Sequence, residues 1–167
     1  LSLHDALPIL LNATSTATIT SATGGSVAYR IGVRIGSSAN LTVTGDVTGG
    51  TQSFAYGLQV GGSSTAIVQG TVVGGSAANA FGMYINGTSA SGVTIAVAKG
   101  GSHVKAAAVC ALLGTVTILD TDLSGAGPII GGSVFKFGHG VALNFQDSNG
   151  ARVIYAPRRR VIVPLVQ

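Results

Sequence analysis

Apolar and polar residues alternate along most of the chain with a period of two, which is typical of a β-strand that buries one face. In residues 33–35, 58–60 and 83–85, two apolar side chains flank an arginine, a glutamine and a tyrosine respectively. Residues 41–44 repeat the alternation with leucine and valine between threonines. We therefore predict short strands whose aliphatic side chains point inward and whose central residues point outward.

The strand pattern recurs about every 25 residues. Residues 28–50 align with residues 53–75 at an offset of 25, which places glycine on glycine and aliphatic residues on aliphatic residues. A third copy spans 78–101, with a loop longer by one or two residues, and a degenerate fourth copy spans 106–127 and loses the glycines. Residues 12–25 match the second half of an earlier copy.

One copy of this length cannot bury its own apolar face, whereas stacked copies form continuous aliphatic columns and parallel ladders. The sequence therefore predicts an all-β protein, a parallel β-helix (β-solenoid) with rungs of about 25 residues over 10–127. An antiparallel, glycine-rich sheet is the alternative. The β-branched content and the glycine density argue against an α-helical repeat.

The pattern changes after Gly127. Residues 141–155 alternate on both sides of "DSNG", which predicts a β-hairpin that turns at Asn149 and Gly150. We expect residues 128–156 to form the last rung and a capping hairpin, because an open parallel edge invites aggregation. Residues 157–167 are then a tail or linker.

Composition narrows the function classes. Only 8% of the 167 residues are charged, and three of the nine basic residues are Arg158–Arg160. The body therefore lacks a continuous basic face, so we do not expect nucleic acid as a partner. No apolar run reaches the roughly 18 residues that a membrane-spanning helix needs. The single cysteine, Cys110, lies in the apolar stretch "AAAVCALL", which favours an inert, packed thiol.

The first nine residues, "LSLHDALPI", differ in composition from all that follows. They resemble the translation of a common short-read sequencing adapter, and such segments are excluded from fold reasoning. We therefore expect residues 1–9 to be an artefact outside the fold, with the natural sequence beginning at about Leu10. This interpretation removes His4 and Asp5 as a candidate site and indicates a fragment of a longer protein.

Parallel β-helices often house polysaccharide lyases and hydrolases, so the carboxylates matter. Asp120 and Asp122, two residues apart in "TILDTDL", are expected on the same strand face. Paired carboxylates can perform acid–base work on a glycosidic bond, and His103 or Lys105, one rung earlier, could assist them. A solvated outer face is the alternative interpretation of the two aspartates.

No other motif indicates catalysis, a cofactor or a metal. Nucleophile-elbow and dinucleotide-binding motifs do not occur. His103 and His139 lie far apart and lack metal-ligand spacing. We therefore predict no cofactor and no metal site.

The cadence "TVTGDVTGG…SFAYGLQVGGSS" resembles the repeats of uncharacterised, glycine-rich parallel β-helix proteins from phages and environmental bacteria. The resemblance covers roughly residues 12–127. It implies a tail-fibre, virion-surface or adhesin-like structural role, and it transfers no catalytic residue. The fourth copy departs from the pattern, because "AAAVCALL" replaces the glycine-bearing strand.

We therefore expect a non-enzymatic structural or adhesive solenoid, a segment of a larger virion-surface or extracellular surface protein. Its expected partners are surface glycans. A β-helix of this kind often forms homotrimers in fibres, although nothing in the sequence requires one. The alternative function is a polysaccharide lyase or hydrolase acting through Asp120 and Asp122.

Overall fold

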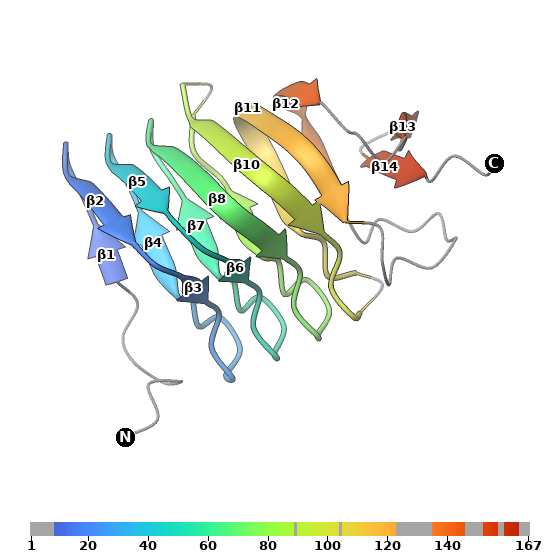
Figure 1. The fold of residues 1–167 in the computed structure, drawn as a ribbon, viewed down its shortest axis with the longest axis horizontal. Coiled ribbons are helices and arrows are strands. Elements are labelled where there is room, and N and C mark those ends of the chain that lie inside the picture. The colour runs from blue at the N-terminus through green and yellow to red at the C-terminus, as the bar shows by residue number, and fades with distance from the viewer. Residues whose placement is uncertain are drawn as a thin grey trace.

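The chain winds as a β-solenoid of about five turns, seen in the computed structural model (Figure 1). The residues that the structure describes contain fourteen β-strands and no helix. The structure describes residues 9–88, 90–103, 105–122, 135–145, 152–156 and 159–163. The parallel β-helix predicted from the repeat is thus confirmed, and the antiparallel sheet is wrong for the body of the chain, because all its strand pairs are parallel.

Three strand stacks form the solenoid wall, and we call them the first, second and third faces. The first face contains β1 (Ile9–Leu11), β4 (Val33–Ile35), β7 (Leu58–Val60) and β9 (Met83–Ile85). The second face contains β2 (Thr16–Ile19), β5 (Asn40–Val43) and the beginnings of β8 (Thr65–Val73) and β10 (Gly92–Lys99). The third face contains β3 (Ala22–Thr23), β6 (Val47–Thr48) and the ends of β8 and β10. A longer strand, β11 (Val109–Asp122), runs through all three faces.

The strand register confirms the spacing of the repeat. Val33 pairs with Leu58, and Leu58 pairs with Met83, each 25 residues further along the chain. On the second face Thr65 pairs with Gly92, 27 residues on. The third copy therefore carries two extra residues in the corner between its first and second faces, as its longer loop predicts.

The core lies inside the solenoid and consists of the predicted aliphatic columns. Val33, Ile35, Leu58, Met83 and Ile85 are almost completely buried, whereas Arg34, between Val33 and Ile35 in sequence, is exposed. Burying each such side chain contributes about 1.5–3 kcal/mol. Stacking of successive turns thus provides the apolar burial that one turn lacks.

Glycine pairs mark the corner after the third face because neighbouring turns approach closely there. A Cβ atom on Gly49 would lie 2.5 Å from the backbone nitrogen of Gly75, and one on Gly75 would overlap the carbonyl oxygen of Gly50. The corner after the first face has a different requirement, since Ser37 and Gly62 adopt φ angles of +62° and +58°. These residues turn the chain in the left-handed region.

The degenerate fourth copy continues the solenoid with a shortened corner. In β11 only Leu112, Leu113 and Gly114 separate the residues paired with β9 from those paired with β10. Gly114 makes this tight corner at a φ of +100°. The predicted rhythm is thus confirmed up to Asp122, and residues 123–127 lie outside the described residues.

The hairpin predicted over 141–155 is wrong in its strand pairing. Residues 141–145 belong to β12 (Phe135–Phe145), which pairs in parallel with β11. A C-terminal hairpin does form, but β13 (Arg152–Ala156) pairs with β14 (Arg159–Val163), which lies in the predicted tail. The edge of β11 outcompetes the local turn signal, because pairing there continues the core column with Val141 and Leu143. Asn149 and Gly150 lie outside the described residues.

The N-terminal boundary falls inside a strand. Ile9, the last residue of the adapter-like segment, begins β1 and pairs with Val33. Residues 1–8 lie outside the described residues, so the interpretation of that segment stays a prediction.

Candidate binding face

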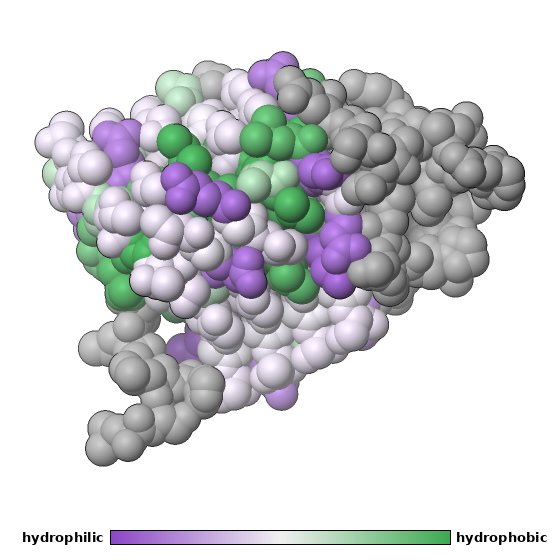
Figure 2. Space-filling model, viewed as in Figure 1, coloured by the Kyte–Doolittle hydropathy of each residue, from purple (hydrophilic) through white to green (hydrophobic). Residues whose placement is uncertain are grey.

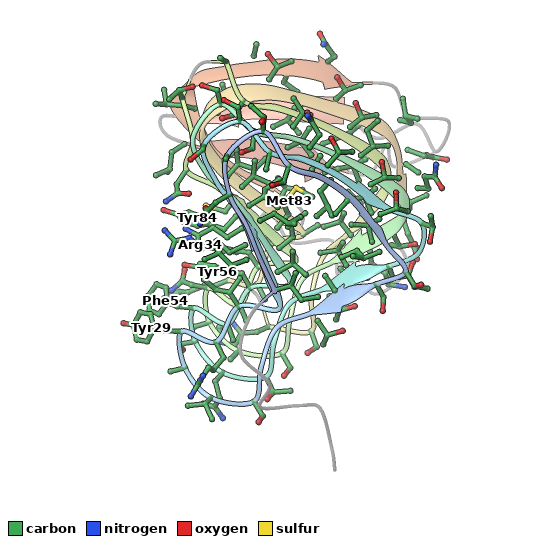
Figure 3. The ribbon with its side chains drawn as sticks, turned by 90° about the vertical axis from the view of Figure 1, so that its left-hand side faces the viewer. Tyr29, Arg34, Phe54, Tyr56, Met83 and Tyr84 are labelled. Carbon is green, nitrogen blue, oxygen red and sulfur yellow. The ribbon has the colours of Figure 1, made fainter. Side chains whose placement is uncertain are left out.

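The outward side of the first face carries a row of residues that includes three large polar or aromatic side chains. Arg34, Gln59, Tyr84 and Cys110 occupy the same register position on successive turns. Met83 points into the interior, while its neighbour Tyr84 points outward (Figure 3). The strand alternation therefore decides which residues this surface displays.

Aromatic rings from three turns stack on this surface and on the turns before its strands. The rings of Tyr29 and Phe54 are parallel within 5°, with centroids 5.1 Å apart. The ring of Tyr56 lies 5.6 Å from Phe81 and 4.7 Å from Tyr84, centroid to centroid. Four of them, all but Phe81, are labelled in Figure 3 and project from the same side of the solenoid. We call these five residues the aromatic face.

The exposed Tyr29 and the partly buried Phe54 both have an unfavourable backbone conformation. A hydrogen bond from the Arg30 amide to the Val27 carbonyl closes a four-residue turn whose third residue, Tyr29, has a φ of +63°. The next turn is equivalent, and its third residue, Phe54, has a φ of +61°. A turn with positive φ at this position favours glycine or asparagine. Bulky side chains are rare there because Cβ crowds the following carbonyl.

The third copy of this turn uses a residue that suits the conformation. Asn79 occupies the equivalent position with a φ of +57°. The solenoid therefore closes this corner without an aromatic side chain. Tyr29 and Phe54 are consequently not required by the turn itself.

Polar groups adjoin the rings. A groove of about 430 Å³ crosses four turns, and its lining includes Asn12, Arg34 and Asn86 together with residues of the corner after the first face. The Gln59 Nε2 donates a hydrogen bond to Asn86 Oδ1 at 3.2 Å. Arg34 is an exposed residue of the groove lining. The groove thus presents amides and a guanidinium group, which form hydrogen bonds with hydroxyl and carboxylate oxygens.

The charge on the first face is positive among the described residues. Arg30 and Arg34 are both exposed. The described carboxylates lie elsewhere: Asp46 is between β5 and β6, and Asp120 and Asp122 are at the end of β11. This surface therefore favours anionic groups over cationic ones.

The two inner tyrosines of the aromatic face stay protonated at neutral pH. Burial raises the pKa of the Tyr56 hydroxyl well above its ordinary value of 10.0, and the neighbouring Tyr84 raises it further. Burial and then Cys110 raise the pKa of Tyr84. Both phenols therefore remain neutral hydrogen-bond donors.

Cys110 lies outside the solenoid core although it is buried. Its side chain packs in a small cluster with Phe81 and Ala107, against Tyr56 and Tyr84. The apolar surroundings agree with the packed thiol expected from the sequence. The sequence did not indicate that this cluster would lie on the outward side of β11.

Asp120 and Asp122 lie on the same side of β11, as predicted, and both are partly exposed around the buried Thr121. The Asp122 Oδ2 lies 2.7 Å from Nζ of Lys99 on the preceding turn. The Asp120 Oδ1 accepts a hydrogen bond from the Thr121 amide at 2.8 Å. Sequence reasoning missed Lys99. An alignment of the third and fourth copies in the strand register places Lys99 opposite Asp122.

The other candidates have local roles or fall outside the described side chains. The Lys105 amide donates a hydrogen bond to Nδ1 of His103 at 3.0 Å, within the turn that precedes β11. Among the described residues, no group of three or more His, Cys, Asp or Glu residues could hold a metal ion. The side chain of His139, in β12, is not described, nor are those of Arg159 and Arg160 in β14.

The second face differs from the first in its chemistry. Thr18, Thr42, Thr94 and Thr117 occupy one outward register position, interrupted by Ile67. Seen from this side, pale residues of intermediate hydropathy alternate with smaller hydrophobic and hydrophilic patches (Figure 2). Aromatic and cationic side chains are thus concentrated on the first face and its preceding turns.

Searches against family models, curated proteins and solved structures found no match for this chain. No helix in the described part of the chain is long and apolar enough to span a membrane.

Proposed function

We propose that the chain is a non-enzymatic structural and adhesive segment of a larger virion-surface protein, resembling a tail fibre, or of an extracellular surface protein. The contrast between the inside and the outside of the solenoid carries this proposal. Ile35, Val60 and Ile85 keep one inward column aliphatic. The outward residues between the columns change from arginine to glutamine to tyrosine.

The architecture suits an extended support for binding groups. Backbone hydrogen bonds join each turn to the next, for example from the Gly61 amide to the Ile35 carbonyl at 2.8 Å. Turns follow at the interstrand spacing of about 4.8 Å, so side chains on one face form a regular row. Substitutions on the outer surface leave the core unchanged, which permits recognition to vary on a constant framework.

Surface glycans are the partner that this surface favours. Planar aromatic rings stack on the C–H faces of sugar rings, and amide groups form hydrogen bonds with sugar hydroxyls. The aromatic face and the adjoining groove with Asn12 and Asn86 provide both types of contact.

A binding screen tests the proposal. The purified chain is passed over immobilised neutral and acidic polysaccharides, and retention is compared with that of heat-unfolded chain. Retention of the folded chain by at least one polysaccharide is expected. No retention on any of them would overturn the adhesive role. Sedimentation velocity on the same sample measures whether the chain forms the trimer common among fibre β-helices.

The alternative, a polysaccharide lyase or hydrolase, has one favourable observation. Asp120 and Asp122 project outward together, and Lys99 adjoins both Asp122 and a groove of about 470 Å³. Incubation of the chain with the retained polysaccharide distinguishes the two functions. The adhesive proposal expects no new reducing ends or unsaturated products. Product formation that disappears in Asp120→Asn and Asp122→Asn would establish the enzyme instead.

A further inference from the structure

We infer that the aromatic face, with Arg34, binds an acidic polysaccharide whose sugar rings contact Tyr29 and Phe54 and whose carboxylate contacts Arg34. This inference rests on the proposed adhesive function and names its ligand class and its main contacts.

The first argument is the position of the rings. Tyr29 is 71% exposed and is stacked on Phe54. Both residues have a φ near +60°. In the following turn of the solenoid, the equivalent residue with this conformation is Asn79. Stacking between the rings contributes about 0.5–1.5 kcal/mol, which partly offsets the unfavourable backbone. Neither turn closure nor burial explains an exposed tyrosine in this conformation, whereas a ligand contact does.

The second argument is charge. Arg34 lies in the polar groove beside Asn12 and Asn86, and Arg30 belongs to the turn that presents Tyr29. The described residues of this face include no carboxylate that would compete for these guanidinium groups. Arginine forms paired hydrogen bonds with carboxylates, so the face selects uronic acids over neutral sugars.

The third argument separates polysaccharides from nucleic acids. Tyr29 and Phe54 are parallel and 5.1 Å apart, so neither a base nor a sugar ring fits between them, and the discrimination rests on charge. Proteins that bind single-stranded nucleic acids combine stacking with a positively charged groove along the backbone. Here two described arginines accompany several amides, a ratio that suits the many hydroxyls and fewer charges of an acidic glycan.

The experiment uses affinity electrophoresis of the full chain in gels containing polygalacturonate. Gels with highly methyl-esterified polygalacturonate provide a neutral ligand of the same backbone, and gels with poly(U) provide the nucleic-acid comparison. We expect retardation by polygalacturonate, at least tenfold weaker retardation by the ester, and weakening by salt. Equal retardation by the ester would overturn the acidic ligand class while leaving glycan adhesion intact. Stronger retardation by poly(U) would overturn the polysaccharide assignment.

Variants then locate the binding site. Arg34→Gln, Tyr29→Asn and Phe54→Asn are each expected to reduce affinity for polygalacturonate at least tenfold. Lys99→Gln removes a cation away from the first face, and Ile67→Asn removes an exposed apolar side chain from the second face. Both controls are expected to retain the parental affinity. Unchanged binding by Arg34→Gln, or equal losses in the controls, would overturn the assignment of the face.

Thermal unfolding distinguishes a binding role of the rings from a structural one. Because asparagine favours positive φ, Tyr29→Asn and Phe54→Asn are expected to unfold at or above the parental temperature while losing affinity. If both variants unfold well below the parental temperature and still bind polygalacturonate when folded, the rings are structural and the inference is wrong.

Discussion

Lys99 on β10 and Asp122 on β11 form an ion pair across adjacent turns, with Nζ and Oδ2 2.7 Å apart. The two residues are directly opposite in the parallel register. Both side chains are about one third exposed, at 34% and 35%, so solvent screens the attraction. The carboxylate that the sequence offered for catalysis thus contributes to the contact between turns.

A double-mutant cycle with Lys99→Met and Asp122→Asn measures this contact. We expect a coupling free energy of about 0.2–1 kcal/mol in urea unfolding, because exposed pairs are weak. The coupling should fall in high salt. Coupling that is absent at low salt would contradict the ion pair.

Gly75→Ala should destabilise the solenoid, whereas Gly92→Ala should not. The new Cβ at Gly75 would overlap the Gly50 carbonyl oxygen, while at Gly92 the nearest atom, Thr65 Cγ2, is 3.8 Å away. We expect a loss of about 1–3 kcal/mol at Gly75 from overpacking. Alanine at Gly92 should be neutral or stabilise by about 0.4–1 kcal/mol. Urea unfolding of both variants checks the contrast, which equal effects would contradict.

Ile85→Ala should lower the free energy of unfolding by about 2–5 kcal/mol, because it leaves a cavity in the aliphatic column. Ile85 is 1% exposed. Thr94→Ala, at an outward position of the second face, is the control and should change stability by less than about 0.5 kcal/mol. Similar losses in the two variants would show that the inward and outward assignments are wrong.

Stability should fall at high pH because the half-buried Tyr56 ionises. Its pKa in the folded state is raised above the ordinary value of 10.0, so the folded chain retains the proton where the unfolded chain loses it. The resulting stabilisation is fully present below pH 10.0 and is lost as the pH rises above that value. Urea unfolding at pH 8 and pH 11 should show a smaller decrease for Tyr56→Phe than for the parent.

Alternation and repeat length were sufficient to predict the parallel solenoid, the inward columns and the longer loop of the third copy, whose two extra residues the strand register then fixed. These features can be predicted from sequence because alternation is a property of consecutive residues. The stacking follows because the alternating segments recur at a regular interval. Asp120 and Asp122 were placed together for the same reason, since residues that are two positions apart on a strand point to the same side.

The candidate binding face was not predictable in this way. Tyr29 and Phe54, 25 residues apart, meet only because the turns stack in register, and their positive φ has no counterpart in a sequence motif. The same holds for Lys99 and Asp122, whose separation reflects the shortened corner at Gly114.

The sequence by itself determined which side chains point inward and how often the chain returns to the same face. Tertiary structure alone decided which edge β12 occupies, so that residues 141–145 extend the solenoid and the C-terminal hairpin forms between β13 and β14. The reason is that a local turn signal competes with a long parallel edge and a continuing apolar column. How strongly the parallel edge and the apolar column attract β12 depends on residues distant in the chain.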